Sequence, residues 1–236
     1  MPADRALVAR LRAALAQAGD PERAAGQQVY MKSTLPFHGL TAPELRRMVD
    51  PILREGAPSD RETWEATVRE LWDGATHREQ WYAALALARH RSARAWQEPG
   101  TLPLYRHLVV TGAWWDVVDE IASRLVGPIL TAYPDVVTPL MSDWAVDDDL
   151  WVRRVAILSQ LRRRGGTDTD LLEECVVANL EGSRFGHEFF IRKALGWALR
   201  EYARTDPAWV LALVDRQEAA LSGLTRREAT KHLHRT

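Results

Sequence analysis

Apolar residues recur at three- and four-residue intervals along almost the entire chain of 236 residues. This spacing places apolar side chains on one face of an α-helix, and no segment shows the alternating pattern of a β-strand. About a dozen helical stretches follow one another, separated by short turns that contain Gly, Pro or Asp. Among the clearest are ALVARLRAALAQAG, SDRETWEATVRELWDG and FGHEFFIRKALGWALREYART. The pattern therefore predicts an all-α protein.

The order of these helices favours a repeat architecture. Successive helices are expected to pair antiparallel and to bury their apolar faces against neighbouring pairs, as in an α-solenoid. The sequence has no strict repeat period, so an irregular helical domain is the alternative. No low-complexity linker interrupts the chain, and residues 1–236 are predicted to form a single domain.

The composition is that of a globular protein, with 46% apolar and 27% charged residues. The single cysteine, Cys175, excludes an internal disulfide and any site built from several cysteines. The N-terminus carries charged residues within its apolar pattern, unlike a secretory signal, and no apolar run approaches the roughly 20 residues that span a bilayer. We expect a cytoplasmic, monomeric protein with no membrane contact.

Tryptophan and positive charge are distributed unevenly. The chain has ten Trp against five Tyr and four Phe, and some of these indoles are expected to face a ligand, because a core filled mainly with Trp is awkward to build. The formal net charge is −1, yet residues 151–164 carry five arginines and no acidic residue. Residues 184–204 carry four arginines and Lys193 against two glutamates. A basic C-terminal half is typical of proteins that bind a phosphate backbone, although solvated helix faces would also explain each run.

Three predicted helices each combine an indole with a charged side chain. In GAWWDVVDEIASRLVG, residues 112–127, Trp115 and Asp119 are four apart and share a face, whereas Asp116 points elsewhere. The same spacing rule groups, on the other two helices, Trp151 with Arg154, and Trp197 with Lys193 and Arg200.

These groupings have two interpretations. An indole at helical spacing is often a core residue, and an aspartate in this position can equally pair with an arginine of a neighbouring helix. Taken together, they favour a substrate with a cationic centre near phosphates. The sequence has no HExxH, no Cys–His ligand set, no P-loop and no GxSxG. The predicted chemistry therefore uses carboxylate, indole and guanidinium groups with no metal and no cofactor.

Six stretches of the chain resemble one known family. In chain order they are YMKSTLPFHGL, RELWD, WWDVVD, WVRRVAIL, EFFIRKALGWALREYA and LTRREATKHL. They match the AlkD-type DNA alkylation repair enzymes, the HEAT-like-repeat alkylpurine DNA glycosylases, and they cover nearly the whole chain. The resemblance implies a curved solenoid of HEAT-like repeats whose concave basic face holds duplex DNA.

The resemblance also implies which residues form the site. Trp115 and Asp119 match the catalytic Trp and Asp of the family's WWD-x-x-D turn, and Trp197 matches the tryptophan of its GW pair. Arg154 matches the arginine of the W-x-x-R segment. The expected DNA contacts are Arg154, the adjacent Arg153, Lys193 and Arg200.

The family excises purines that alkylation has made cationic, such as 3-methyladenine and 7-methylguanine, without flipping the base. A cationic purine leaves as a neutral base and needs no general acid, so the barrier lies at C1′ of the sugar, which becomes oxocarbenium-like. We expect Asp119 to stabilise this charge and orient a water, with Trp115 and Trp197 against the deoxyribose. With no amine nucleophile evident, a monofunctional glycosylase is expected. The alternative is a non-catalytic helical-repeat module that binds DNA structures or a protein partner and keeps both indoles in its core.

Overall fold

The computed structural model describes residues 1–233, and the regular elements within this range are all helices. Fourteen α-helices follow one another in these residues, with neighbouring helices packed on each other. The all-α prediction is confirmed, and the arrangement is consistent with an α-solenoid of helical repeats. The chain divides into two compact units, Met1–Gln97 and Glu98–Thr236. That residues 1–236 form a single domain stays a prediction, and the last three of them lie outside the described range.

The first unit begins its helices where the sequence indicates. The Glu44 carboxylate accepts a hydrogen bond from the backbone N–H of Thr41 at 2.7 Å, as expected of a capping box. Asp60 accepts from the backbone N–H of Thr63 at 2.8 Å and so caps the next helix. The α-helices of this unit are α1 (Arg5–Gln17), α2 (Pro21–Met31), α3 (Ala42–Gly56), α4 (Arg61–Asp73) and α5 (Arg78–Ala88).

Several tryptophans of the first unit belong to its core. Trp64 and Trp72 are fully buried. The indole N–H of Trp64 donates to the carbonyl of Leu87 at 3.2 Å, and the ring of Trp72 stacks on Trp81 with centroids 4.8 Å apart. Part of the high Trp content therefore serves packing and not a ligand.

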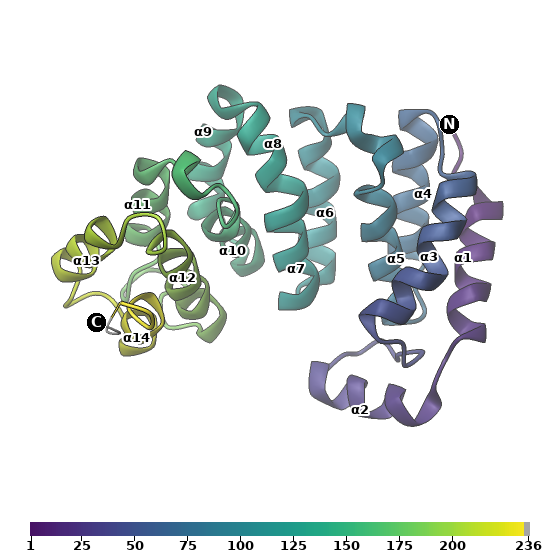
Figure 1. The fold of residues 1–236 in the computed structure, drawn as a ribbon, viewed down its shortest axis with the longest axis horizontal. Coiled ribbons are helices and arrows are strands. Elements are labelled where there is room, and N and C mark those ends of the chain that lie inside the picture. The colour runs from purple at the N-terminus through teal and green to yellow at the C-terminus, as the bar shows by residue number, and fades with distance from the viewer. Residues whose placement is uncertain (234–236) are drawn as a thin grey trace. The chain divides into compact units, whose positions relative to one another are not determined.

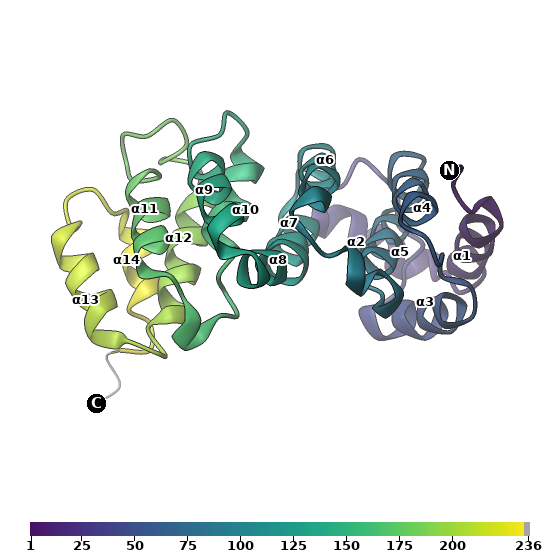
Figure 2. The same ribbon diagram turned by 90° about the horizontal axis from the view of Figure 1, so that it is seen from above.

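The second unit contains the remaining helices, coloured from teal to yellow in Figure 1. Helix α10 packs against α7 and α12, and α12 packs against α14, so these four helices form a continuous set of neighbours (Figures 1 and 2). The α-helices of this unit are α6 (Leu102–Gly112), α7 (Trp115–Ile121), α8 (Gly127–Ala132), α9 (Pro134–Ala145), α10 (Leu150–Leu158), α11 (Thr169–Val177), α12 (Phe189–Tyr202), α13 (Pro207–Arg216) and α14 (Gly223–Ala229).

A π-helix joins α7 to α8, which the sequence pattern does not predict. It spans Ala122–Val126 and keeps the chain helical from Trp115 to Ala132. Directly after it, Gly127 lies so close to α10 that a Cβ there would be 2.5 Å from the carbonyl oxygen of Ser159. A π-turn holds one residue more than an α-turn, so it shifts the helix face immediately before this close crossing.

None of the helices within residues 1–233 is long and apolar enough to cross a membrane.

Candidate active site

The start of α7 is set by Ala113, which adopts the left-handed backbone conformation. Helix α6 ends at Gly112, and Ala113 follows with φ 36° and ψ 41°. Its backbone N–H donates to the carbonyl of Val109 at 2.9 Å, which closes α6. A residue with a Cβ is disfavoured in this region by roughly 1–2 kcal/mol. The turn lets Trp114 remain extended while α7 begins at Trp115.

Trp114 points into an aromatic cluster with Trp151 and Phe190. The ring centroids of Trp114 lie 6.0 Å from Trp151 and 5.2 Å from Phe190, and those of Trp151 and Phe190 lie 5.0 Å apart. Among the described residues, the buried indole N–H of Trp114 has no hydrogen-bond partner. Trp151, which the spacing pattern grouped with Arg154, is therefore a packing residue beside that arginine.

Asp119 of α7 is paired with Arg154 of α10. Arg154 donates through Nε to Oδ1 at 2.8 Å and through Nη2 to Oδ2 at 2.9 Å. The Asp119 side chain is 15% exposed and that of Arg154 only 5%. Arg154 also donates through Nη1 to the carbonyl of Phe190, so the guanidinium is fixed on two sides. The alternative considered for Asp119, pairing with an arginine of a neighbouring helix, is what the structure contains.

The environment of Asp119 affects its protonation. Burial raises the pKa of this carboxyl above its ordinary value, while the hydrogen bonds and positive charge of Arg154 oppose the rise. Each carboxylate oxygen accepts one hydrogen bond from Arg154 and retains a further lone pair. The site therefore contains an oriented carboxylate that can still accept a hydrogen bond from water.

An open pocket of about 240 Å³ lies beside this ion pair, within the second unit. It brings together the half-buried indoles of Trp115 and Trp197, which come from α7 and α12. Asp119 itself is outside the lining and adjoins the pocket through Arg154. The lining residues are Trp115, Arg154, Phe189, Phe190, Lys193, Trp197, Arg200 and Glu228.

Glu228 of α14 is a site residue that the sequence analysis missed. Its carboxylate accepts from Lys193 Nζ at 2.8 Å and also pairs with Nη1 of Arg200. The hydrogen bond from Lys193 is the main reason that the pKa of Glu228 is lowered. This pairing depends on a close crossing of α12 and α14, where a Cβ on Gly196 would be 2.5 Å from Glu228 Cβ. In the sequence, Gly196 is the residue whose missing side chain permits this close approach.

Arg153 lies outside the pocket and has an internal role. It is 6% exposed and donates to the carbonyls of Asp147 at 2.6 Å and Val146 at 3.0 Å, which follow the end of α9. A guanidinium bound to the carbonyls after a helix stabilises that helix end. We therefore leave Arg153 out of the DNA contacts proposed below, because, unlike Arg154, it is not part of the pocket lining and its guanidinium is bound to the end of α9 and to the Asn179 side chain.

The pocket has more positive than negative charge. Arg154, Lys193 and Arg200 are matched by the carboxylates of Asp119 and Glu228, which leaves one cation in excess. Within residues 1–233, no group of three or more His, Cys, Asp or Glu is placed to hold a metal ion. The arrangement combines aromatic faces, an oriented carboxylate and guanidinium groups at one surface.

The model of the family described as DNA alkylation repair enzyme matches residues 11–233. The chain belongs to this family. It is also similar to a solved structure of a predicted DNA alkylation repair enzyme from Enterococcus faecalis, with 32% identity and a TM-score of 0.80. That match covers 92% of this chain and 98% of the other. The comparison with curated proteins gave no match. Membership in the family supports a role in DNA repair, with DNA as the partner.

Proposed function

We propose that this member of the DNA alkylation repair family is a monofunctional alkylpurine DNA glycosylase. Its substrates would be N3- and N7-alkylated purines in duplex DNA, and its reaction the hydrolysis of the N-glycosidic bond. The observation that carries the proposal is the Asp119–Arg154 pair beside a pocket lined by Trp115 and Trp197.

The chemistry follows from the charge of the lesion. When the bond from C1′ to the purine nitrogen breaks, its electron pair neutralises the cationic purine, and positive charge develops on the sugar. The Asp119 carboxylate would stabilise this charge and hold a water through its remaining lone pairs. Water then adds to C1′ and gives up one proton, first to the carboxylate and then to solvent. The indole faces would lie against the cationic sugar, an attraction of about 0.5–2 kcal/mol for each ring.

Arg154 would act in two ways. Its paired N–H groups orient Asp119, and a guanidinium has more N–H donors than the three used within the protein, so it could also reach a DNA phosphate. Lys193 and Arg200 would contribute further phosphate contacts from the same pocket.

The lining of the pocket supports excision without base flipping. Among the described residues that line it there is no amide and no hydroxyl side chain, and the Glu228 carboxylate is occupied by Lys193 and Arg200. The other polar side chains of this lining are donors only, so among the described residues no free acceptor is available for the donor groups of an extruded purine. Selectivity would come instead from the lability of the cationic lesion.

The state of Lys193 supports a monofunctional reaction. Its ammonium is hydrogen-bonded to Glu228, and a protonated amine has no free electron pair for attack on the sugar. The strand should therefore remain uncut at the abasic product.

The test is release of free 7-methylguanine from methylated duplex DNA, with the strand analysed for an intact abasic site. We expect release by the wild-type protein and loss of at least about a hundredfold in single-turnover rate for Asp119→Asn, the size of other electrostatic contributions. Asp135→Asn, which removes an exposed carboxylate on α9 outside the pocket lining, is the matched control and should keep its rate. No release by the wild-type protein, together with retained DNA binding, would favour the non-catalytic DNA-binding module.

A further inference from the structure

A second pocket lies farther along the helix that carries Trp115 and Asp119. It has a volume of about 480 Å³ and lies between the π-helix with α8 and the turn that follows α10. Ser123 of this pocket donates its hydroxyl to the carbonyl of Asp119 at 2.8 Å, which links the two regions. The lining residues are Ser123, Gly127, Pro128, Thr131, Ala132, Ser159, Arg162, Arg163 and Gly166.

Among the described residues, the cations of this second pocket have no carboxylate partner, unlike those of the candidate active site. Within residues 1–233, Arg162 has neither a hydrogen-bonded nor an ion-paired partner, and Arg163 donates only to the Gln160 side chain, at 3.1 Å. The Nε of Arg163 is buried and has no acceptor among these residues. No acidic residue is part of the described lining. The pocket therefore contains guanidinium N–H groups, including the buried Nε of Arg163, that have no acceptor among the described residues.

Gln160 fixes one of these guanidinium groups in place. Its Oε1 accepts from Arg163 Nη1 and from the backbone N–H of Asp168 at 2.8 Å, and its Nε2 donates to the Asp168 carbonyl at 2.9 Å. Gln160 itself is 6% exposed. Arg163 is thus held before any ligand binds, which lowers the entropy lost when a ligand is bound.

The remaining lining indicates what the ligand is. The hydroxyl hydrogens of Ser123 and Thr131 are already donated to backbone carbonyls, so an anion here must be bound by the arginines. Gly127, Pro128 and Ala132 offer apolar surface next to them. A phosphate joined to a sugar fits both features, since the guanidinium groups bind the phosphate oxygens and the apolar surface contacts sugar carbons.

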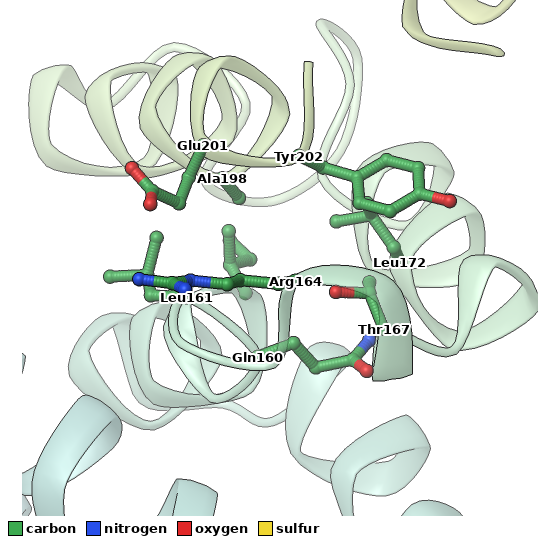
Figure 3. A pocket seen from close by; sticks show the side chains of 9 residues that line it. Gln160, Leu161, Arg164, Thr167, Leu172, Ala198, Glu201 and Tyr202 are labelled. Atoms are coloured by element: carbon green, nitrogen blue, oxygen red, sulfur yellow. The ribbon is translucent and has the colours of Figure 1, made fainter. Parts of the chain in front are cut away.

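A neighbouring pocket is too small to be a ligand site. It has a volume of about 10 Å³, roughly the space of a single water, and lies beside the same turn between α10 and α11. Figure 3 shows the polar ends of Arg164 and Glu201 on one side of it and Tyr202 with Leu172 on the other.

We propose that Arg162 and Arg163 form a second phosphate site that holds a backbone phosphate of the duplex away from the nucleotide that reacts. The proposal rests on the proposed function, because it assigns a further contact with the same DNA. Trp115 and Ser123 are roughly 12 Å apart along their helix, at the usual rise of about 1.5 Å per residue. Consecutive phosphates of one strand advance by only about 3.4 Å along the duplex axis, so a site this far from Trp115 would hold a phosphate other than that of the reacting nucleotide.

The test compares Arg162→Ala/Arg163→Ala with Arg204→Ala/Arg216→Ala, which removes the same charge from arginines that pair with Glu201 and Glu173. Binding of an undamaged fluorescent duplex is measured over a range of salt concentrations. The first variant should bind about tenfold more weakly, and the slope of log K against log salt should fall by about 0.9, the value for one phosphate contact. The single-turnover excision rate at saturating protein should remain that of the wild type. The control should keep both affinity and slope.

An unchanged affinity and slope in the first variant would overturn the proposal. If inorganic phosphate raises the melting temperature of the wild type but not of the variant, while duplex binding is unchanged, the pocket binds free phosphate and the duplex assignment is wrong. Arg162→Ala alone tests the proposal should the double variant fail to fold, because Arg162 is exposed and has no partner within the described residues. A wild-type protein that binds DNA through this site but releases no base would refute the glycosylase and leave the phosphate site standing.

Discussion

Arg154 of α10 holds both carboxylate oxygens of Asp119 on α7, with N–O distances of 2.8 and 2.9 Å. The two residues join neighbouring helices at a largely buried point beside the pocket. The pair therefore has a structural effect as well as its proposed catalytic one, and the two effects can be separated experimentally.

Replacement of Arg154 by Met should destabilise the protein and abolish excision. Loss of one partner leaves the Asp119 carboxylate buried without a counter-charge, which costs about 3 kcal/mol in the free energy of unfolding. Urea unfolding measures the stability. In the double variant Asp119→Leu/Arg154→Met, most of the stability should return because no unpaired charge remains, whereas activity should stay absent. Equal stability of the single and double variants would contradict this account.

The excision rate should fall in acid because the ionised form of Asp119 is the active one. Burial raises the pKa of this carboxyl above its ordinary value of 3.8. Protonation as the pH falls through the raised pKa removes the negative charge, so the rate drops on the acid side and is constant above it. The measurement is single-turnover release of 7-methylguanine as a function of pH, after subtraction of spontaneous loss. A rate that stays constant to below pH 3.8 in folded protein would exclude the role of the carboxylate.

Ala113→Gly should stabilise the protein. Ala113 has φ 36°, where its Cβ is disfavoured, and relief of this strain exceeds the extra flexibility of glycine in the unfolded chain by roughly 0.5 kcal/mol. The change in stability is measured by thermal unfolding. Ala178→Gly is the matched control, because Ala178 also ends a helix but has φ −64°, and there glycine should reduce stability. A loss of stability in Ala113→Gly would show that the left-handed turn is unstrained.

Gly196→Ala should weaken the packing of α12 on α14. The added Cβ would lie 2.5 Å from Glu228 Cβ, and such overpacking costs about 1–3 kcal/mol of unfolding free energy. Displacement of Glu228 should also free Lys193 and Arg200, so binding to undamaged duplex should become tighter. Gly26→Ala, where a Cβ meets nothing within 4 Å, is the control and should be neutral or stabilising. Unchanged stability and affinity in Gly196→Ala would show that the helices adjust without cost.

Local patterns were enough to predict the helices and to group several residues that line one pocket. The four-residue spacing placed Trp115 and Asp119 on one face of α7, although only Trp115 lines the pocket. The stripe on α12 grouped Trp197 with Lys193 and Arg200, and all three line that pocket. These groupings depend only on helical geometry, which the sequence determines over a few residues.

Contacts between residues that are far apart in the sequence could not be predicted from local patterns. Arg153 and Arg154 are adjacent, and only the packing of α10 decides that one reaches the end of α9 while the other pairs with Asp119. Glu228 likewise becomes a site residue only because α14 crosses α12 at Gly196. The π-helix at Ala122–Val126 had no signal of its own in the apolar pattern.

The turn at Ala113 also determines how two consecutive tryptophans are used, since Trp114 packs inward and Trp115 borders the pocket. Inserting a single residue between Gly112 and Asp119 would rotate the start of α7 by about 100°. An insertion ahead of Trp114 would move that indole to the position of Trp115 and would move Trp115 to the position of Asp116. The carboxylate would turn away from Arg154, although composition and helix content would hardly change. At this point of the chain, the number of residues matters as much as their identity.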